Sequence, residues 1–235
     1  MRTRLYRPFY CVLALCLLAL AGCVDREPQQ RAAFILFLQT RVTAAPGALV
    51  RPPSESEREA LGGYARQYEV IGDFQEALKD SMADVGEAVR VLTLHSLAEI
   101  AARGAQFQAL QTRLAQSKQA LHTARARADE ARAALLQADD LKQAFTPAYQ
   151  KAVTEPASAL LTLYPAMQDT LADARRVAAY VQLHEKQLLV DGALAQVRDP
   201  SVQAQFNTLL AQLNGRSGDI DAASRQLSAL RPPAP

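Results

Sequence analysis

The sequence has few cysteines and few aromatic residues, which limits the disulfides and the kind of core that it can form. It has three cysteines in 235 residues, all within the first 23, no tryptophan, and 6% aromatic residues. Beyond Cys23 the chain therefore has no second thiol for a disulfide, whatever its redox compartment. Few aromatic residues beside many alanines favour thin helix–helix packing over a thick sheet core.

Histidine is scarce as well, and the motifs of familiar enzymes are missing. His95, His122 and His184 lie far apart, none is in an HExxH arrangement, and His184 and Glu185 face apart on a helix. The sequence has no phosphate loop or dinucleotide fingerprint, and "GRSG" (215–218) lacks the spacing of a nucleophile elbow. We therefore predict no catalytic residue, no metal ligand and no cofactor, and we expect that the protein is not an enzyme.

The excess of positive charge disappears when the first 22 residues are set aside. The chain has 26 basic and 24 acidic residues; Arg2, Arg4 and Arg7 lie in that leading segment, which has no acidic residue. The remaining 23 basic and 24 acidic residues leave a net charge of −1. A nucleic-acid partner is therefore not expected.

The first 22 residues are typical of an export signal. Basic "MRTRLYRPFY" is followed by the apolar run "CVLALCLLALAG" (11–22), which is shorter than the ~20 residues that span a bilayer as a stable helix. Small residues end the run directly before Cys23. We predict a signal peptide over residues 1–22, cleaved between Gly22 and Cys23.

"LAGC" (20–23) resembles the lipobox of bacterial lipoproteins, an apolar residue and two small residues before the cysteine that is lipidated. The resemblance implies a diacylglycerol thioether on Cys23 and a permanent anchor, since two or three acyl chains hold a protein stably at a membrane. The alternatives are an ordinary secretory signal or an uncleaved anchor. Val24 is not the Asp linked to inner-membrane retention, so the outer membrane is favoured, although Asp25 follows it.

Apolar residues at three- and four-residue spacing predict helices through most of the remaining chain. One heptad seam runs from Phe107 to Ala138 on a helix predicted over residues 97–138, and another runs from Leu160 to Val181. The middle of the first seam is made of small residues. We expect them to form a long antiparallel hairpin, joined by a Pro-marked turn between Asp139 and Pro156. The fold class is therefore all-α, an elongated helical bundle with a coiled-coil-like hairpin.

Local signals mark where shorter elements begin and end. Ser54 and Glu57 form a capping box, and Asp199-Pro200 begins a last helix that "NGRSGD" interrupts. Asp191-Gly192 predicts either a short β-hairpin or a helix C-cap. Residues 89–100 fit an extended link as well as a helix, and Asp139-Asp140 fits a cap or turn better than a metal site.

The domain organisation follows from these signals. A lipidated tether (23–30) precedes a single helical domain (31–230) and a disordered tail (231–235). Residues 34–38, "FILFL", form either a first core helix or a segment lying on the lipid surface.

The stretches "CVDREPQQRAAFILFLQT" and "ADDLKQAFTPAYQKAVTEPASAL" resemble the YiaF-like proteobacterial lipoproteins, a family of unknown function. The resemblance implies an exported, lipid-anchored helical protein and transfers no catalytic residue. The first functional hypothesis is a non-enzymatic lipoprotein that faces the periplasm and contacts an envelope protein along its helical surface. The alternative is a ligand-binding (lipid or cell-wall fragment) or enzymatic helical domain, with a pocket near residues 89–100 and 188–197.

Overall fold

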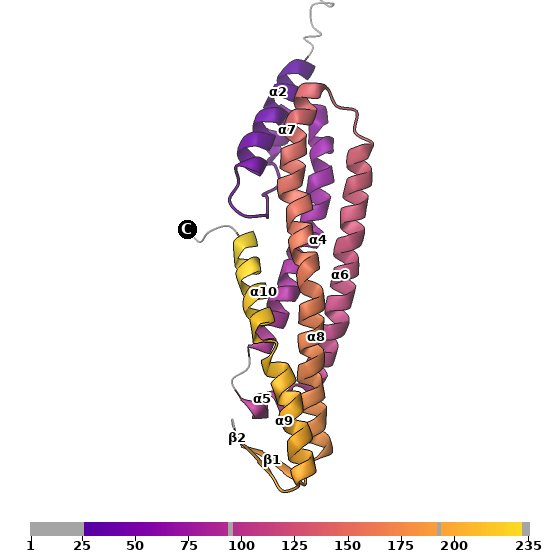
Figure 1. Ribbon diagram of the computed structural model, residues 1–235. Coiled ribbons are helices and arrows are strands. Elements are labelled where there is room, and N and C mark those ends of the chain that lie inside the picture. Colours follow the sequence, from indigo (N-terminus) through magenta and orange to yellow (C-terminus); the bar gives the residue numbers. More distant parts are fainter. Residues whose placement is uncertain (1–25, 94–95, 192–193, 232–235) are drawn as a thin grey trace, which may run out of the picture.

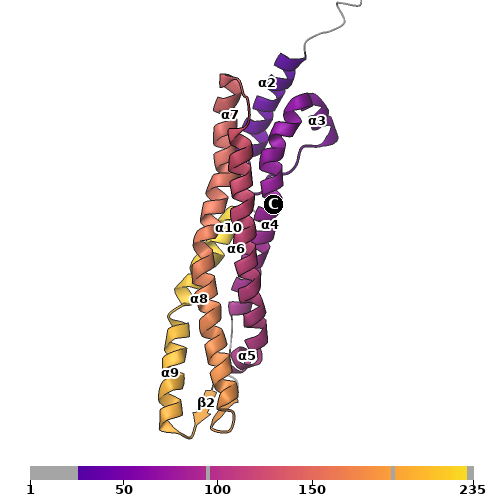
Figure 2. The same cartoon turned by 90° about the vertical axis from the view of Figure 1, so that its right-hand side faces the viewer.

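The predicted apolar stripes form the interfaces between three long helices, α4 (Ala65–Leu92), α6 (Gly104–Ala133) and α8 (Glu155–Leu183). The computed structural model describes residues 26–93, 96–191 and 194–231. The three helices run side by side along a rod, and α6 is antiparallel to both α4 and α8 (Figures 1 and 2). The prediction of an elongated all-α bundle is confirmed.

The seams of α6 and α8 meet as the heptads predicted over most of their length, although Ala131 and Ala138 of the predicted α6 seam are exposed. Ser117 Oγ lies 2.8 Å from the hydroxyl oxygen of Tyr164, and Gln111 donates to the carbonyl of Gln168 at 3.3 Å, so the two helices run in opposite directions. On α6 the seam is buried at Phe107, Leu110, Leu114, Ser117, Leu121 and Ala128. On α8 all the predicted seam residues are buried, Leu160, Tyr164, Met167, Leu171, Ala174, Ala178 and Val181.

The connection between these two helices lies elsewhere than predicted. The segment expected to be a turn, between Asp139 and Pro156, is helical: α7 (Asp139–Tyr149) continues through a π-helical segment, η3 (Gln150–Thr154), into α8. The wider π turn accommodates the proline that follows it. The actual connection is residues 134–138, and the helix predicted over 97–138 is divided into α5 (Leu97–Ala102) and α6.

The N-terminal helix packs into the core through one face. α2 (Glu27–Phe37) continues into a π-helical segment, η1 (Leu38–Thr43), and Phe34, Phe37 and Leu38 are buried. The Phe34 ring stacks on the Tyr64 ring with centroids 5.7 Å apart. These contacts make residues 34–38 part of the core, with only Leu36 largely exposed. Residues 27–30, predicted as part of the tether, are helical, with Pro28 in the first turn.

The capping box is present and begins α3 (Glu55–Leu61). Glu57 N donates to Ser54 Oγ at 3.3 Å, and Ser54 N donates to Glu57 Oε2 at 2.8 Å. The predicted helix is then interrupted at the two glycines: Gly62 has a φ of +55°, and a 3₁₀ turn, η2 (Gly62–Tyr64), separates α3 from α4.

The C-terminal part contains the predicted hairpin and two helices. β1 (Leu188–Asp191) pairs antiparallel with β2 (Leu194–Val197), which decides for the hairpin over the helix C-cap; residues 192 and 193 lie outside the described part. Asp199 caps α9 (Pro200–Asn214) by accepting from Ser201 N at 2.8 Å. α10 (Ser217–Leu230) then packs against α4 and α8, and residues 232–235 of the predicted tail are outside the description.

Candidate functional site

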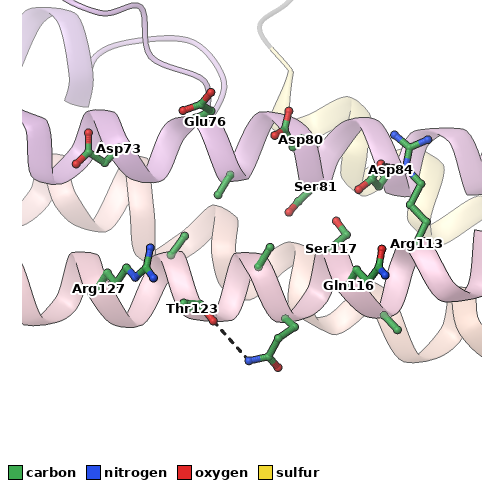
Figure 3. A pocket seen from close by; sticks show the side chains of 15 residues that line it. Asp73, Glu76, Asp80, Ser81, Asp84, Arg113, Gln116, Ser117, Thr123 and Arg127 are labelled. Atoms are coloured by element: carbon green, nitrogen blue, oxygen red, sulfur yellow. Dashed lines mark hydrogen bonds and ion pairs between the residues drawn. The ribbon is translucent and has the colours of Figure 1, made fainter.

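A long groove lies between α4 and α6, and its lining reaches down to Ser117 of the α6 seam. Its volume is about 1060 Å³. The two helices run antiparallel along its two sides. Asp73 of α4 therefore faces the Arg127 end of α6, and Asp84 faces Arg113 (Figure 3). The groove is therefore a channel along the rod rather than an enclosed pocket.

One wall of the groove carries a row of carboxylates from α4. Asp73, Glu76, Asp80 and Asp84 follow one another at three- and four-residue spacing, which places them on one helix face. Asp84 is 9% exposed and is paired with Arg113, whose Nε lies 2.5 Å from Asp84 Oδ1. Within the described part of the chain, the other three carboxylates have no ion-pair partner.

The floor of the groove is made of small side chains. Ser81 and Ser117 point toward one another across it (Figure 3), and beneath them lies the buried hydroxyl of Tyr164. Burial raises the pKa of Tyr164, against the lowering effect of its hydrogen bonds with Ser117 and Ser81. The phenol therefore stays protonated at neutral pH. The remaining small residues of the floor and walls are Ala77, Ala115, Ala120, Thr123 and Ala124.

This chemistry suits binding better than catalysis. Among the described residues that line the groove, none is a histidine or a cysteine. A serine without a neighbouring base is a weak nucleophile, and a tyrosine with a raised pKa is a poor base at neutral pH. The small floor instead allows a close approach by another backbone, and the carboxylates attract positive charge.

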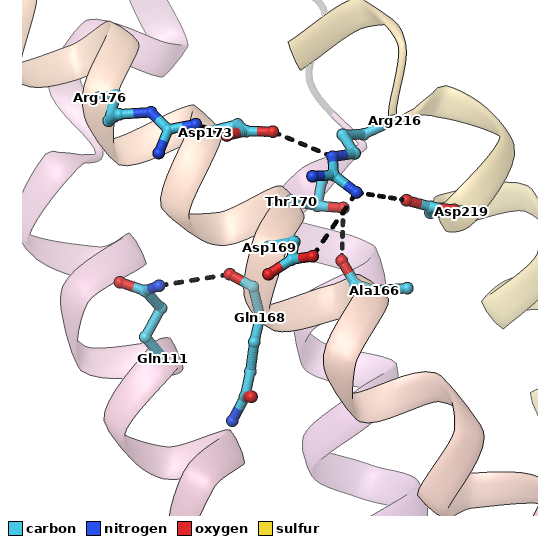
Figure 4. Close-up of polar contacts among 9 residues, drawn as sticks. All are labelled: Gln111, Ala166, Gln168, Asp169, Thr170, Asp173, Arg176, Arg216 and Asp219. Carbon is cyan, nitrogen blue, oxygen red and sulfur yellow. Dashed lines mark hydrogen bonds and ion pairs between the residues drawn. The ribbon is translucent and has the colours of Figure 1, made fainter. Parts of the chain in front are cut away.

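A second polar cluster joins the C-terminal helices to α8. Asp173 is 4% exposed and accepts from Arg216 Nε at 3.0 Å and from Arg176 (Figure 4). Arg216 lies at the turn between α9 and α10 and also reaches Asp169 and Asp219, each at 3.6 Å. The hydrogen bond to Asp173 raises the pKa of Arg216. We assign this cluster to stability, because every charge in it is paired.

The residues singled out from the sequence are not brought together. His122 is exposed on α6, whereas His184 Nδ1 lies 3.1 Å from Gln187 Oε1 at the far end of α8. His95, Gly22 and Cys23 lie outside the described residues. In the described part of the chain, no group of three His, Cys, Asp or Glu side chains is placed to hold a metal ion.

Asp139 and Asp140 lie in the first turn of α7, where their charge complements the helix dipole. Asp140 Oδ1 also lies 3.6 Å from Arg31 of α2. The sequence predicted a cap or turn here, whereas the N-cap is Ala138 and both aspartates lie within the helix.

The groove was not predicted from the sequence, which placed a pocket near residues 89–100 and 188–197. The signal was nevertheless present in "DFQEALKDSMAD" (73–84), where acidic residues recur on one helix face. The identity of the helix across the groove was not readable from that stretch. Among the described helices, none combines the length and the apolar character needed to cross a membrane.

Residues 11–228 match the model of a protein family described as "Protein of unknown function (DUF3053)". The chain belongs to this family. It is 28% identical over 203 residues to "Uncharacterized protein YiaF" of Escherichia coli (strain K12) and to the protein of the same name from Shigella flexneri, covering 85% of this chain and 85% of each relative. No solved structure matches it. The resemblance noted in the sequence is thus confirmed, and the family carries no assigned activity.

Proposed function

We propose that this protein is a lipid-anchored, periplasm-facing lipoprotein of the bacterial envelope with a non-enzymatic role, and that its helical body binds another envelope protein. The anchor is supported by the basic start, the apolar run and the small residues before Cys23. Val24 favours the outer membrane over the inner membrane.

The observation that carries the binding role is the groove between α4 and α6. Three carboxylates, Asp73, Glu76 and Asp80, face it from one wall without an ion-pair partner in the described part. Between them and α6 the floor is made of small alanine, serine and threonine side chains, and α6 also contributes Arg113, Gln116, Gln119 and Arg127 to the lining. The occupant that fits both features is an amphipathic helix with small residues on one side and lysine or arginine along its edge.

Photo-crosslinking in cells tests this role. A photoreactive amino acid replaces Ala120, which lines the groove, or His122, which is exposed on the same helix outside it. Side chains two positions apart on an α-helix point in nearly opposite directions. We therefore expect one dominant protein adduct from position 120 and none from position 122. Equal capture by both positions, or no capture at 120, would contradict the proposal.

Charge reversal tests the chemistry of the partner. Asp80→Lys should greatly reduce the adduct formed from position 120, because it replaces an unpaired carboxylate with a positive charge. Glu130→Lys makes the same change on an exposed position of α6 outside the groove and should leave the adduct unchanged. If both variants reduce the adduct equally, the carboxylate row does not select the partner.

The alternative is a groove that binds a small ligand, such as a lipid or a cell-wall fragment. Its volume and the hydroxyls of Ser81 and Ser117 in its lining favour this second candidate. A bound ligand raises the melting temperature with its concentration. Thermal melts with lipids, muropeptides and metal ions should show no shift if the first proposal holds.

A further inference from the structure

The described chain begins at one end of the rod, and this position limits where a membrane anchor would lie. Arg26 is the first described residue, and α2 begins at Glu27 at the end of the rod where α7 also begins (Figure 1). Arg26 follows Cys23 by three positions, a distance of at most about 11 Å, since an extended chain spans ~3.3–3.6 Å per residue. If Cys23 is lipidated, this end of the rod lies against the bilayer.

The connection between α6 and α7, residues 134–138, lies at the same end; we call it the α6–α7 tip. Gln137 Nε2 donates to Gln67 Oε1 at 2.8 Å, which holds the tip against the beginning of α4. Asp140, two residues after the tip, lies 3.6 Å from Arg31 of α2. Figure 2 shows the same arrangement from the side, with α2 and the start of α7 at one end of the molecule.

The α6–α7 tip exposes a leucine that is not packed into the described core. Leu136 is 96% exposed, whereas its neighbour Leu135 packs partly against the core. Among the described residues, the other large apolar side chains that are mostly exposed are Leu36 of α2, and Leu183 and Leu189 of α8 and β1 at the opposite end of the rod. Leu136 is therefore the most exposed of them, and it lies at the end where the anchor would be.

Two cations flank this leucine. Arg132 and Lys142 line a hollow of about 460 Å³ together with Leu135 and Leu136. The Arg132 guanidinium lies 4.6 Å above the Tyr149 ring and donates to Thr146 Oγ1 at 3.3 Å, so its position is supported. The acid in this hollow, Asp129, accepts from the Tyr149 hydroxyl at 2.7 Å.

We propose that the α6–α7 tip is a second membrane contact, in which Leu136 enters the lipid interface while Arg132 and Lys142 face the phosphates of anionic phospholipids. This inference rests on the proposed lipid anchor and extends it. Apolar side chains beside cations are typical of segments that lie at a membrane surface. Two membrane contacts at one end would orient the rod so that it projects from the bilayer. The β1–β2 hairpin then lies at the end far from the membrane.

The test uses the full-length protein in cells, with a diazirine amino acid in place of Leu136 or, as a control, of Leu183. Both positions are exposed, so neither replacement disturbs the core. After irradiation, mass spectrometry should find phospholipid adducts at position 136 and only background at position 183. Protein adducts instead of lipid adducts at 136, or equal lipid adducts at both positions, would overturn the contact.

The acyl mass on Cys23, measured in the same samples, separates the two proposals. Acylated Cys23 without lipid adducts at 136 overturns the second contact and leaves the anchor. Unmodified Cys23 overturns the anchor, and lipid adducts at 136 would then support a membrane contact that is independent of it. Lys142→Gln should lower the share of phosphatidylglycerol among the adducts; an unchanged share would overturn the charged part of the contact.

Discussion

Gln75 of α4 donates a hydrogen bond of 2.7 Å from Nε2 to the carbonyl oxygen of Ala152 in η3. In a regular α-helix this carbonyl would accept from the N–H of residue 156, but residue 156 is a proline and has none. The same amide accepts from Val50 N at 2.8 Å and donates to the Ala48 carbonyl at 3.2 Å. One buried side chain therefore joins a nearby loop to the irregular turn of a helix that lies 77 residues further along the chain.

Replacing Gln75 with leucine should destabilise the protein by about 2–4 kcal/mol, since it leaves buried backbone groups without partners. Val50 N and the carbonyls of Ala48 and Ala152 are the groups affected. Urea unfolding followed by circular dichroism measures the change. Gln119→Leu, on an exposed face of α6, is the control and should be close to neutral. A cost for Gln75→Leu no larger than that of the control would show that the network contributes little.

Gly62→Ala should cost about 1–2 kcal/mol, because φ is +55° there and a side chain strains that conformation. The new Cβ would also meet the end of the Gln30 side chain, which would have to move. Gly63→Ala is the matched control, since a Cβ at Gly63 meets nothing within 4 Å. The difference in melting temperature between the two variants checks this expectation, and equal melting temperatures would contradict it.

Tyr68→Phe should stabilise the protein by about 1 kcal/mol at neutral pH, because the Tyr68 hydroxyl is buried without a hydrogen-bond partner among the described residues. The ring itself, which packs edge-on against Phe37 with centroids 5.2 Å apart, is retained. Chemical denaturation at pH 7 measures the gain.

The same variant should change the alkaline limb of the stability curve. Burial, with a smaller contribution from Glu57, raises the pKa of Tyr68 from 10.0 to about 12. Between these values the unfolded chain has lost the phenolic proton while the folded protein keeps it, so the stability of the wild type falls as pH rises from 10 to 12. Tyr68→Phe should reduce this fall; parallel curves for the two proteins would contradict the assignment.

Arg216→Ala should cost about 1–3 kcal/mol, because it removes a charge-assisted hydrogen bond to the buried carboxylate of Asp173. Arg176 remains as the other partner of Asp173 and limits the loss. Hydrogen exchange should speed up first in α9 and α10, which Arg216 connects to α8. Arg225→Ala, on an exposed position of α10, should leave exchange unchanged; equal effects would assign no special role to the cluster.

Cys23→Ala should release the protein from the membrane or mislocalise it, because no thiol then remains after the signal peptide to carry the lipid. Fractionation of cells and mass spectrometry of the mature N-terminus are the measurements. Val24→Asp, with Cys23 kept, should move the protein toward the inner membrane. Recovery of unmodified wild-type protein, with Cys23 intact, from the soluble fraction would overturn the lipid anchor.

Much of the fold was predicted because its causes are local. The capping box of Ser54 and Glu57, the N-cap of Asp199 and the hairpin at residues 188–197 each depend on side chains a few positions apart. The seams of α6 and α8 were predicted for the same reason, since a three- and four-residue spacing places apolar residues on one helix face whatever surrounds them.

Tertiary structure decided the features that depend on distant partners. Residues 139–156 contain two prolines and were predicted as a turn, yet they are helical. Gln75 pairs with the buried carbonyl that Pro156 leaves without a helical donor, and core packing holds the π turn. The acidic row of α4 was visible in the sequence, but only the packing of α6 beside it makes a groove. Caps, turns and helix faces depend on neighbouring residues and can be predicted from the sequence. The hydrogen bond from Gln75 to the Ala152 carbonyl joins residues 77 positions apart and forms only when the chain folds.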